Sequence, residues 1–312
     1  MTNLKKLKLL VASALLSSTA VYADDCTNNT STTNCGIAIT GNQTIDIGSD
    51  ISVRDEPGIN ITSSSNTLTI DGDITVTSSV NNTFGLNIGN GGNNNNVINM
   101  TGDISTISTG GATGMHGIRI GSNSSSNTIN VTGNVSTTRG NSSGILIIEG
   151  GDNNNITLNG NINTSGGLNS NGIRITGQNS SNFGINNTIT VNGDVSSVYS
   201  HAIAITGYAH DSYIVVNGNV QSTNSAAIHI SQTDTVNNIV TVNGNVSTSA
   251  TSANATIAFN SGASDNLVVI DGNVTQLANL PAIKFGANGT DTSHDNTVSV
   301  SGNITSAGTG IR

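Results

Sequence analysis

Closely spaced carboxylates are the residues of this chain most able to do acid–base chemistry. Asp71 and Asp73 lie two residues apart, and Asp103 and Asp194 follow a glycine in similar short phrases. Hydrolysis of a polysaccharide needs two carboxyl groups a few ångströms apart, one acting as acid and the other as base. Asparagine takes the same place in other copies of the phrase, as at Asn245. Because an amide suits a turn but cannot replace a catalytic carboxylate, we interpret these positions as structural.

The five histidines form no paired catalytic or metal-binding motif. His116, in Gly114-Met-His-Gly117, faintly resembles a Gly-His-Gly motif of polygalacturonases, but their remaining motifs are missing, so we interpret it as a turn residue. The sequence contains no serine-protease signature and no Gly-Lys-Ser/Thr phosphate loop. We therefore expect no enzymatic activity, no cofactor and no metal site.

The first 23 residues have the pattern of a secretory signal. Lysines at positions 5, 6 and 8 precede an apolar stretch from Leu9 to Leu16, and small residues at Ala20 and Ala23 suit a cleavage site. No later segment has the roughly 18 uninterrupted apolar residues of a membrane helix. The mature chain is therefore expected to be exported.

Cys26 and Cys35 are the only cysteines, and both lie in residues 24–35, which we interpret as an N-terminal cap. In an exported chain this pair predicts a disulfide closing a small loop. A metal site would need further ligands nearby, and the sequence offers none.

The mature chain is strongly acidic. All 18 acidic residues lie after Ala23, but only 6 of the 9 basic ones do, which gives a net charge of −12. Duplex nucleic acid repels such a chain, because its binding needs a basic footprint. We expect no nucleic-acid partner.

One phrase recurs nine times: two apolar residues in alternation, then Gly, then Asn or Asp, then Ile or Val. The copies are separated by 25–33 residues. This regular spacing predicts stacked units that bury their apolar faces against one another. The glycines are Gly72, Gly102, Gly133, Gly160, Gly193, Gly218, Gly244, Gly272 and Gly302.

A second phrase, Gly or Ala followed by apolar-any-apolar, alternates with the first, as at Gly117-Ile-Arg-Ile120. Both phrases have the period of two that is typical of strands. Together they predict an all-β fold: a right-handed parallel β-helix of about ten three-strand coils over residues 36–312. Each coil should point five apolar side chains inward. The Gly-Asn and Gly-Asp pairs suggest a tight bend at positive φ, and the longer segment from Gln178 to Asn186 should protrude as a loop.

The variable position of the second phrase should face solvent and form one column along the rod. Four of the six basic residues of the mature chain fall in it. We consider two interpretations: a basic stripe of Arg119, Arg174, His229 and Lys284 that contacts acidic glycans or anionic headgroups, or a solvent-facing position where basic residues discourage sideways aggregation. The column is Ala38, Asn60, Asn87, Arg119, Leu146, Arg174, Ala204, His229, Ala258, Lys284 and Arg312.

With its secretory signal followed by Asn-, Thr- and Gly-rich coils, the chain resembles the passenger region of bacterial autotransporters (type V secretion). The resemblance implies export by the Sec machinery and display at the cell surface, commonly as an adhesin that binds a host glycan or receptor. Autotransporters end in an outer-membrane barrel, which residues up to Arg312 do not contain. We therefore expect a truncated passenger whose barrel is encoded downstream.

Two other functional classes remain open. One is a secreted β-helix protein that binds or degrades polysaccharides. The other is an exoprotein similar to filamentous haemagglutinin.

Overall fold

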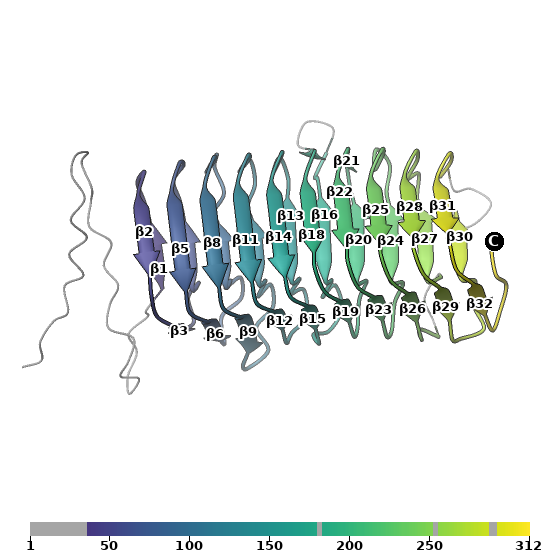
Figure 1. Ribbon diagram of the computed structural model, residues 1–312, viewed down its shortest axis with the longest axis horizontal. Helices are drawn as coiled ribbons and strands as arrows, with labels where there is room; N and C mark the ends of the chain where they lie inside the picture. Colours follow the sequence, from purple (N-terminus) through teal and green to yellow (C-terminus); the bar gives the residue numbers. More distant parts are fainter. Residues whose placement is uncertain (1–35, 180–182, 252–254, 287–291) are drawn as a thin grey trace, which may run out of the picture.

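The computed structural model describes residues 36–179, 183–251, 255–286 and 292–312. The expected signal peptide, the cap and the Cys26–Cys35 disulfide lie outside these residues. The described chain consists of strands and turns, wound as a straight parallel β-helix (Figure 1). The predicted fold is confirmed, with three strands in each coil.

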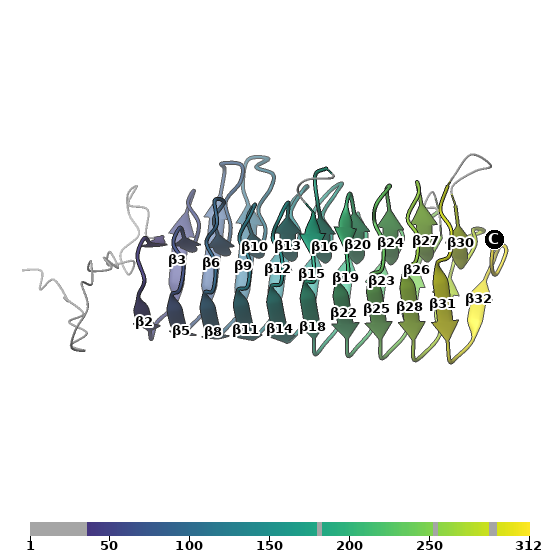
Figure 2. The same cartoon turned by 90° about the horizontal axis from the view of Figure 1, so that it is seen from above.

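Three ten-stranded parallel sheets run the length of the rod, and Figure 2 shows them from a second direction. With strands spaced about 4.8 Å apart, ten coils make a rod about 48 Å long. Sheet A contains β1 (Ile37–Ile39), β4 (Ile59–Ile61), β7 (Leu86–Ile88), β10 (Ile118–Ile120), β13 (Ile145–Ile148), β16 (Ile173–Thr176), β20 (Ile203–Thr206), β24 (Ile228–Ser231), β27 (Ile257–Asn260) and β30 (Ile283–Phe285).

Sheet B carries the strand before the glycine corner of each coil. It contains β2 (Thr44–Ile47), β5 (Thr67–Asp71), β8 (Val97–Thr101), β11 (Thr128–Thr132), β14 (Asn155–Asn159), β18 (Thr188–Val191), β22 (Tyr213–Val216), β25 (Ile239–Val242), β28 (Leu267–Ile270) and β31 (Thr297–Val300).

Sheet C carries the strand after that corner. It contains β3 (Ile51–Arg54), β6 (Ile74–Ser78), β9 (Ile104–Ser108), β12 (Val135–Thr137), β15 (Ile162–Thr164), β19 (Val195–Ser197), β23 (Val220–Ser222), β26 (Val246–Thr248), β29 (Val274–Gln276) and β32 (Ile304–Ser306).

The five inward positions of each coil form the core, as predicted. In the coil that begins with β5, the five are Leu68, Ile70, Ile74, Leu86 and Ile88, and each is at most 1% exposed. Like residues stack on like through the parallel register, for example Ile98 on Ile129 on Ile156. These stacked aliphatic residues give the chain a continuous core although it contains few aromatic residues. The described part of the chain contains no helix.

A sixth inward position, two residues after the first residue of each sheet C strand, is polar in most coils and was not predicted. The hydroxyl of Thr137 donates to the Ser142 carbonyl at 2.8 Å, and that of Ser222 donates to the Ser200 carbonyl at 2.7 Å. These hydroxyls therefore satisfy carbonyls in the connections that lead from sheet C to sheet A. A buried polar group of this kind is tolerated because it is hydrogen-bonded.

The reason predicted for the glycine corner was largely wrong. Of its nine glycines, only Gly102 and Gly133 have positive φ, at 142° and 151°. The shared constraint is close approach: a Cβ at any of the nine would lie 2.0–2.5 Å from a backbone atom of the preceding coil. Glycine is needed at this corner because neighbouring coils touch there through their backbones.

Positive φ occurs instead at the corner between sheets A and B. Nine residues that each lie two positions before a sheet B strand, all Asn, Asp or Ser, have φ between 52° and 60°. Asn and Asp tolerate this region better than other non-glycine residues. The nine are Ser65, Asn95, Ser126, Asn153, Asn186, Asp211, Asn237, Asp265 and Asp295.

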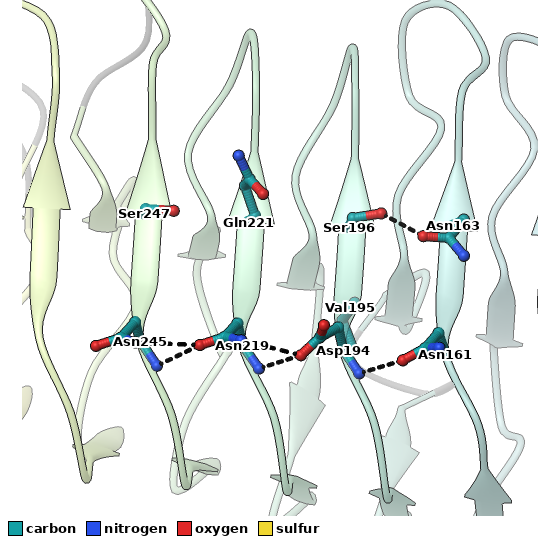
Figure 3. Close-up of a pocket in the computed structure, with 9 residues that line it drawn as sticks. All are labelled: Asn161, Asn163, Asp194, Val195, Ser196, Asn219, Gln221, Asn245 and Ser247. Atoms are coloured by element: carbon teal, nitrogen blue, oxygen red, sulfur yellow. Dashed lines mark hydrogen bonds between the residues drawn. The ribbon is translucent and has the colours of Figure 1, made fainter.

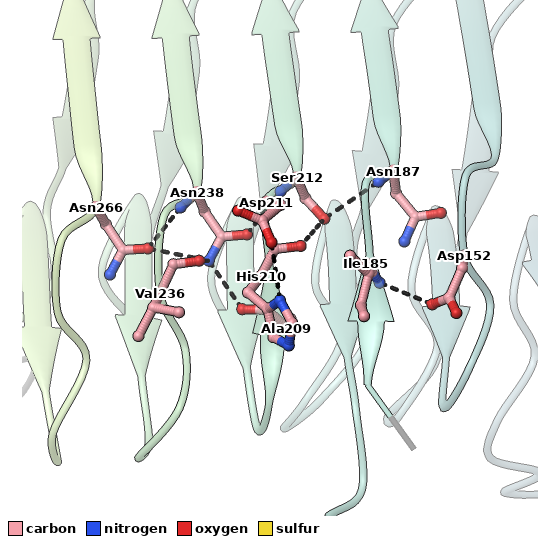
Figure 4. Close-up of polar contacts among 10 residues, drawn as sticks. All are labelled: Asp152, Ile185, Asn187, Ala209, His210, Asp211, Ser212, Val236, Asn238 and Asn266. Atoms are coloured by element: carbon pink, nitrogen blue, oxygen red, sulfur yellow. Dashed lines mark hydrogen bonds and ion pairs between the residues drawn. The ribbon is translucent and has the colours of Figure 1, made fainter. Parts of the chain in front are cut away.

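The segment from Gln178 to Asn186 is in part strand-paired. It contains β17 (Gly184–Ile185), which pairs with β21 (Ala209–His210) of the next coil. The Ile185 amide also donates to a carboxylate oxygen of Asp152 at 2.8 Å (Figure 4). The expected loop is therefore anchored to the coils on both sides of it.

Candidate functional site on the outer face of sheet A

The predicted stripe residues do share one column on the outer face of sheet A. The strand register pairs Arg119 with Leu146, Leu146 with Arg174, Arg174 with Ala204 and Ala204 with His229. The register continues to Lys284 through Ala258. The predicted column is therefore confirmed, with its residues stacked one coil above another.

The expectation that this column faces solvent holds for its end members, Ala38 and Arg312, but is wrong for the column between them. Lys284 is 8% exposed and Leu146 is 6% exposed, while Arg119, Arg174 and His229 are half-buried. The connections that lead into sheet A carry side chains that cover the column. The residues two positions before the sheet A strands are aligned by backbone hydrogen bonds between neighbouring coils, and they include Phe84, His116, Ser143, Asn171 and His201.

Arg119 is satisfied within the protein. Its guanidinium donates to Asn87 Oδ1 at 2.9 Å and to Asn90 Oδ1 at 2.8 Å. It also lies over the Phe84 ring, 5.0 Å from the centroid, and His116 stacks on the same ring. A cation over an aromatic face is stabilised by the ring quadrupole. Arg119 is therefore poorly placed to contact a ligand.

Three histidines line this face, and all are neutral at pH 7. Burial, with a smaller contribution from the charges of Arg119 and Arg174, lowers the pKa of His116 to about 3. Burial lowers the pKa of His201 to about 4 and that of His229 to about 3. The His201 and His229 rings stack with centroids 4.2 Å apart. Two charged imidazoles at that distance would repel each other, so the packing also favours the neutral forms.

Arg174 differs from Arg119 in having no partner. Among the described residues it makes no hydrogen bond or ion pair, and its column neighbours, Leu146 and Ala204, offer no acceptor. Burial lowers its pKa, and no carboxylate counteracts this, whereas the charge of Glu149 does so for Arg119. A half-buried cation without a counterion is costly, so Arg174 is the exceptional residue of the predicted stripe.

The outer face of sheet C is open by comparison. Its outward column holds only Ser, Thr, Asn and Gln, and a shallow hollow lies on it over β15, β19, β23 and β26 (Figure 3). Amides and hydroxyls suit hydrogen bonding to neutral sugars. The hollow is lined by Asn161, Asn163, Asp194, Val195, Ser196, Asn219, Gln221, Asn245 and Ser247.

Asp73, Asp103 and Asp194, which the sequence analysis interpreted as structural, accept backbone amides from the neighbouring coil. Asp73 Oδ1 accepts the Asp103 amide at 2.7 Å, and Asp194 Oδ1 accepts the Asn219 amide at 2.7 Å. The same contact repeats from coil to coil at the glycine corner. We call this the outer ladder, formed by Asp50, Asp73, Asp103, Asn134, Asn161, Asp194, Asn219, Asn245, Asn273 and Asn303.

A second ladder, which the sequence analysis missed, lies at the corner between sheets A and B (Figure 4). Each side-chain oxygen accepts a backbone amide from the neighbouring coil, and most amide groups donate along the same line, as from Asn127 to Asn154 at 3.0 Å. The signal was present as an Asn two residues before the first inward residue in eight of the ten sheet B strands. We call this the inner ladder, formed by Asn66, Asn96, Asn127, Asn154, Asn187, Ser212, Asn238, Asn266 and Asn296.

No protein-family model, curated protein or solved structure matches this chain. Within its described residues, no group of His, Cys, Asp and Glu side chains is arranged to hold a metal ion. That part of the chain also has no helix capable of crossing a membrane. The fold class is therefore defined by the structure alone: a parallel β-helix.

Proposed function

We propose that this chain is the exported passenger of a bacterial autotransporter, displayed at the cell surface as an adhesin-like or structural rod. The observation that carries the proposal is the uninterrupted stacking of ten coils into three parallel sheets. A rod of this kind holds surface groups at fixed spacing, and each coil needs contacts only with its neighbours. Such a rod suits display better than catalysis.

The amino-terminal pattern supports export. A basic start, an apolar stretch and small residues before Asp24 are what the Sec machinery recognises. The partners we propose are therefore the Sec machinery, an outer-membrane barrel encoded downstream, and a host glycan or surface receptor. We propose no nucleic-acid partner and no enzymatic activity.

Surface display can be tested with the full natural reading frame in a Gram-negative host. Antibodies against the β-helix should label intact cells, and added protease should remove the labelling. Deleting residues 2–23 should retain the protein in the cytoplasm. Equal labelling of intact wild-type cells and intact deletion cells would contradict the proposal. So would a wild-type protein that the protease reaches only after the cells are lysed. Coding sequence for a membrane barrel downstream would support it independently.

The hollow on sheet C favours a second candidate, an exported protein that binds or degrades neutral polysaccharides. Gln221 is exposed and Asn163 is exposed, and both amides line that hollow. Replacing both by Ala should abolish retention on a neutral polysaccharide that the wild type binds. The release of new reducing ends from that polymer would indicate degradation, and no retention by the wild type would remove this candidate.

A further inference from the structure

We propose that Arg174 is the cation of an anion-binding site on the outer face of sheet A, and that the site takes a carboxylate or sulfate group of an acidic glycan. This inference rests on the proposed adhesin-like function and specifies its ligand. It also narrows the predicted stripe, because Arg119 is used internally and Lys284 is almost fully buried.

The contrast between Arg174 and Arg119 is the first step. Both lie in the same column, separated by Leu146 alone. Arg119 has two amide oxygens and an aromatic ring, whereas Arg174 has no acceptor among the described residues. Buried or half-buried charges are normally paired. An unpaired guanidinium in a chain with twice as many acidic as basic residues therefore indicates a place for an external anion.

His116 supplies the second step through its tautomer. Its Nδ1 accepts the Ser143 backbone N–H at 2.9 Å, so in the neutral ring the proton is on Nε2. No described residue accepts a hydrogen bond from that Nε2–H. A neutral imidazole of this kind donates to an anion without adding a second charge to the face.

Ser143 supplies the third step. It is 1% exposed, and its Oγ has no hydrogen-bond partner. It lies two residues before β13, the sheet A strand whose Leu146 pairs with Arg174. A buried hydroxyl left unsatisfied destabilises the fold, and a bound anionic oxygen would satisfy it. Two unused donors and an unpaired cation thus lie on one face in three successive coils, those of β10, β13 and β16.

Arg174 has a matched control in Arg139. Arg139 is exposed and lies outside the column, so Arg139→Gln and Arg174→Gln change the net charge equally. The probes are a dextran sulfate oligosaccharide, a carboxylated oligosaccharide, unmodified dextran and inorganic sulfate, with binding measured by calorimetry on the purified mature protein at fixed salt. We expect wild-type binding to at least one acidic oligosaccharide, a loss of at least tenfold in R174Q, and a change of less than twofold in R139Q.

Several results would overturn the assignment. These are no acidic binding by the wild type, equal losses in the two arginine variants, or equal affinity for unmodified dextran. Binding to phosphatidylserine vesicles without binding to either acidic oligosaccharide would also overturn it. Competition by millimolar inorganic sulfate would show that the anionic group itself is recognised, and a failure to compete would count against that recognition.

Ser143→Ala separates a ligand role from a structural one. The free protein makes no use of the Ser143 hydroxyl, so we expect S143A to unfold at the wild-type temperature or slightly above it while binding the acidic oligosaccharide two- to fivefold more weakly. Unchanged binding in S143A would remove Ser143 from the site. Because all these measurements are made in solution, their failure would leave surface display untouched, and a failure of surface display would leave them valid.

Discussion

The inner and outer ladders use the same contact under opposite conditions of burial. In both, a side-chain oxygen accepts a backbone amide of a neighbouring coil: Asn127 of the inner ladder accepts from Asn96 of the preceding coil, and Asp73 of the outer ladder accepts from Asp103 of the following coil. The inner ladder is almost fully buried and contains eight Asn and one Ser, whereas the outer ladder is largely exposed and contains four Asp. The geometry of the contact accepts either carboxylate or amide. Burial is what excludes the charge, because a carboxylate inside would lose its hydration.

Of the substitutions proposed, a carboxylate in the inner ladder should lower the free energy of unfolding the most. Asn127 is fully buried between Asn96 and Asn154, and its amide donates to Asn154 Oδ1 at 3.0 Å. Asn127→Asp removes that donor and places a charge beside an amide oxygen. We expect it to lower the free energy of unfolding by about 3 kcal/mol or more. Chemical denaturation at pH 7 measures this directly.

The matched variant is Asn245→Asp in the outer ladder. Asn245 is exposed, its ladder neighbours are amides, and other coils already carry Asp at this place. We expect a change of at most about 0.5 kcal/mol, as for other surface substitutions. If the two variants lost similar stability, burial would not be the property that distinguishes the ladders.

The glycine corner, which carries the outer ladder, should not tolerate replacement of its glycine even though it tolerates changes in charge. A Cβ at Gly160 would lie 2.0 Å from the Gly133 carbonyl oxygen. Because that atom belongs to the backbone of the preceding coil, Gly160→Ala should force the coils apart and cost about 1–3 kcal/mol. Gly48→Ala is the control, since a Cβ there would contact nothing within 4 Å. Equal thermal stability of the two variants would show that close approach does not determine the glycine.

Both the ladders and the core were only partly foreseeable. The alternation of apolar Ile and Val residues predicted the strands, and the regular spacing of Gly72 and its equivalents predicted the coils. Both predictions succeeded because equivalent side chains recur once in each turn of a stacked solenoid. The cause of the glycine could not be inferred, since the sequence does not report how closely two backbones approach. The inner ladder was hidden because Asn is abundant throughout the chain, so one more recurrent Asn carried no distinct pattern.

The alignment of the candidate-site residues in one column could be predicted from the sequence, but the side chains that surround them could not. The second phrase placed Arg119 and Arg174 in one column, and the register agrees. Period-two alternation says only that a side chain points away from the core, so it cannot reveal that connections such as the one carrying Phe84 and His116 cover that face. The difference between the two arginines depends on those connections.

Acid should destabilise the protein through the buried histidines and leave the neutral inner ladder unaffected. The ordinary histidine pKa of 6.5 is lowered to about 3 for His229 and about 4 for His201. Between these limits the unfolded chain binds protons that the folded chain does not, so stability falls as the pH decreases from about 6.5 to about 4. Each such histidine contributes a slope of about 1.4 kcal/mol per pH unit.

His229→Gln should flatten this slope by one histidine's contribution, whatever its effect on stability at pH 7. His294→Gln is the control, because His294 is exposed and pairs with neighbouring Asp295 at the surface. The measurement is the free energy of unfolding at half-unit steps of pH. An identical slope in H229Q and the wild type would show that His229 does not resist protonation in the folded state.

The smallest expected effect comes from closing the one break in the inner ladder. Ser212 replaces Asn there, and the Asn187 amide reaches its Oγ at 3.4 Å, longer than the 3.0 Å from the Asn127 amide to Asn154. Ser212→Asn offers a closer acceptor, as Asn does in the neighbouring coils, and a net gain of about 0.5–1 kcal/mol is the usual contribution of one such hydrogen bond. Ser212 is 1% exposed, so the larger side chain must fit between Asn187 and Asn238. A rise in the unfolding midpoint would show that ladder continuity limits stability at this coil. A fall of more than about 1 kcal/mol in the free energy of unfolding would show that the space around residue 212 limits stability instead. The inner ladder would then be constrained by side-chain volume as well as by charge.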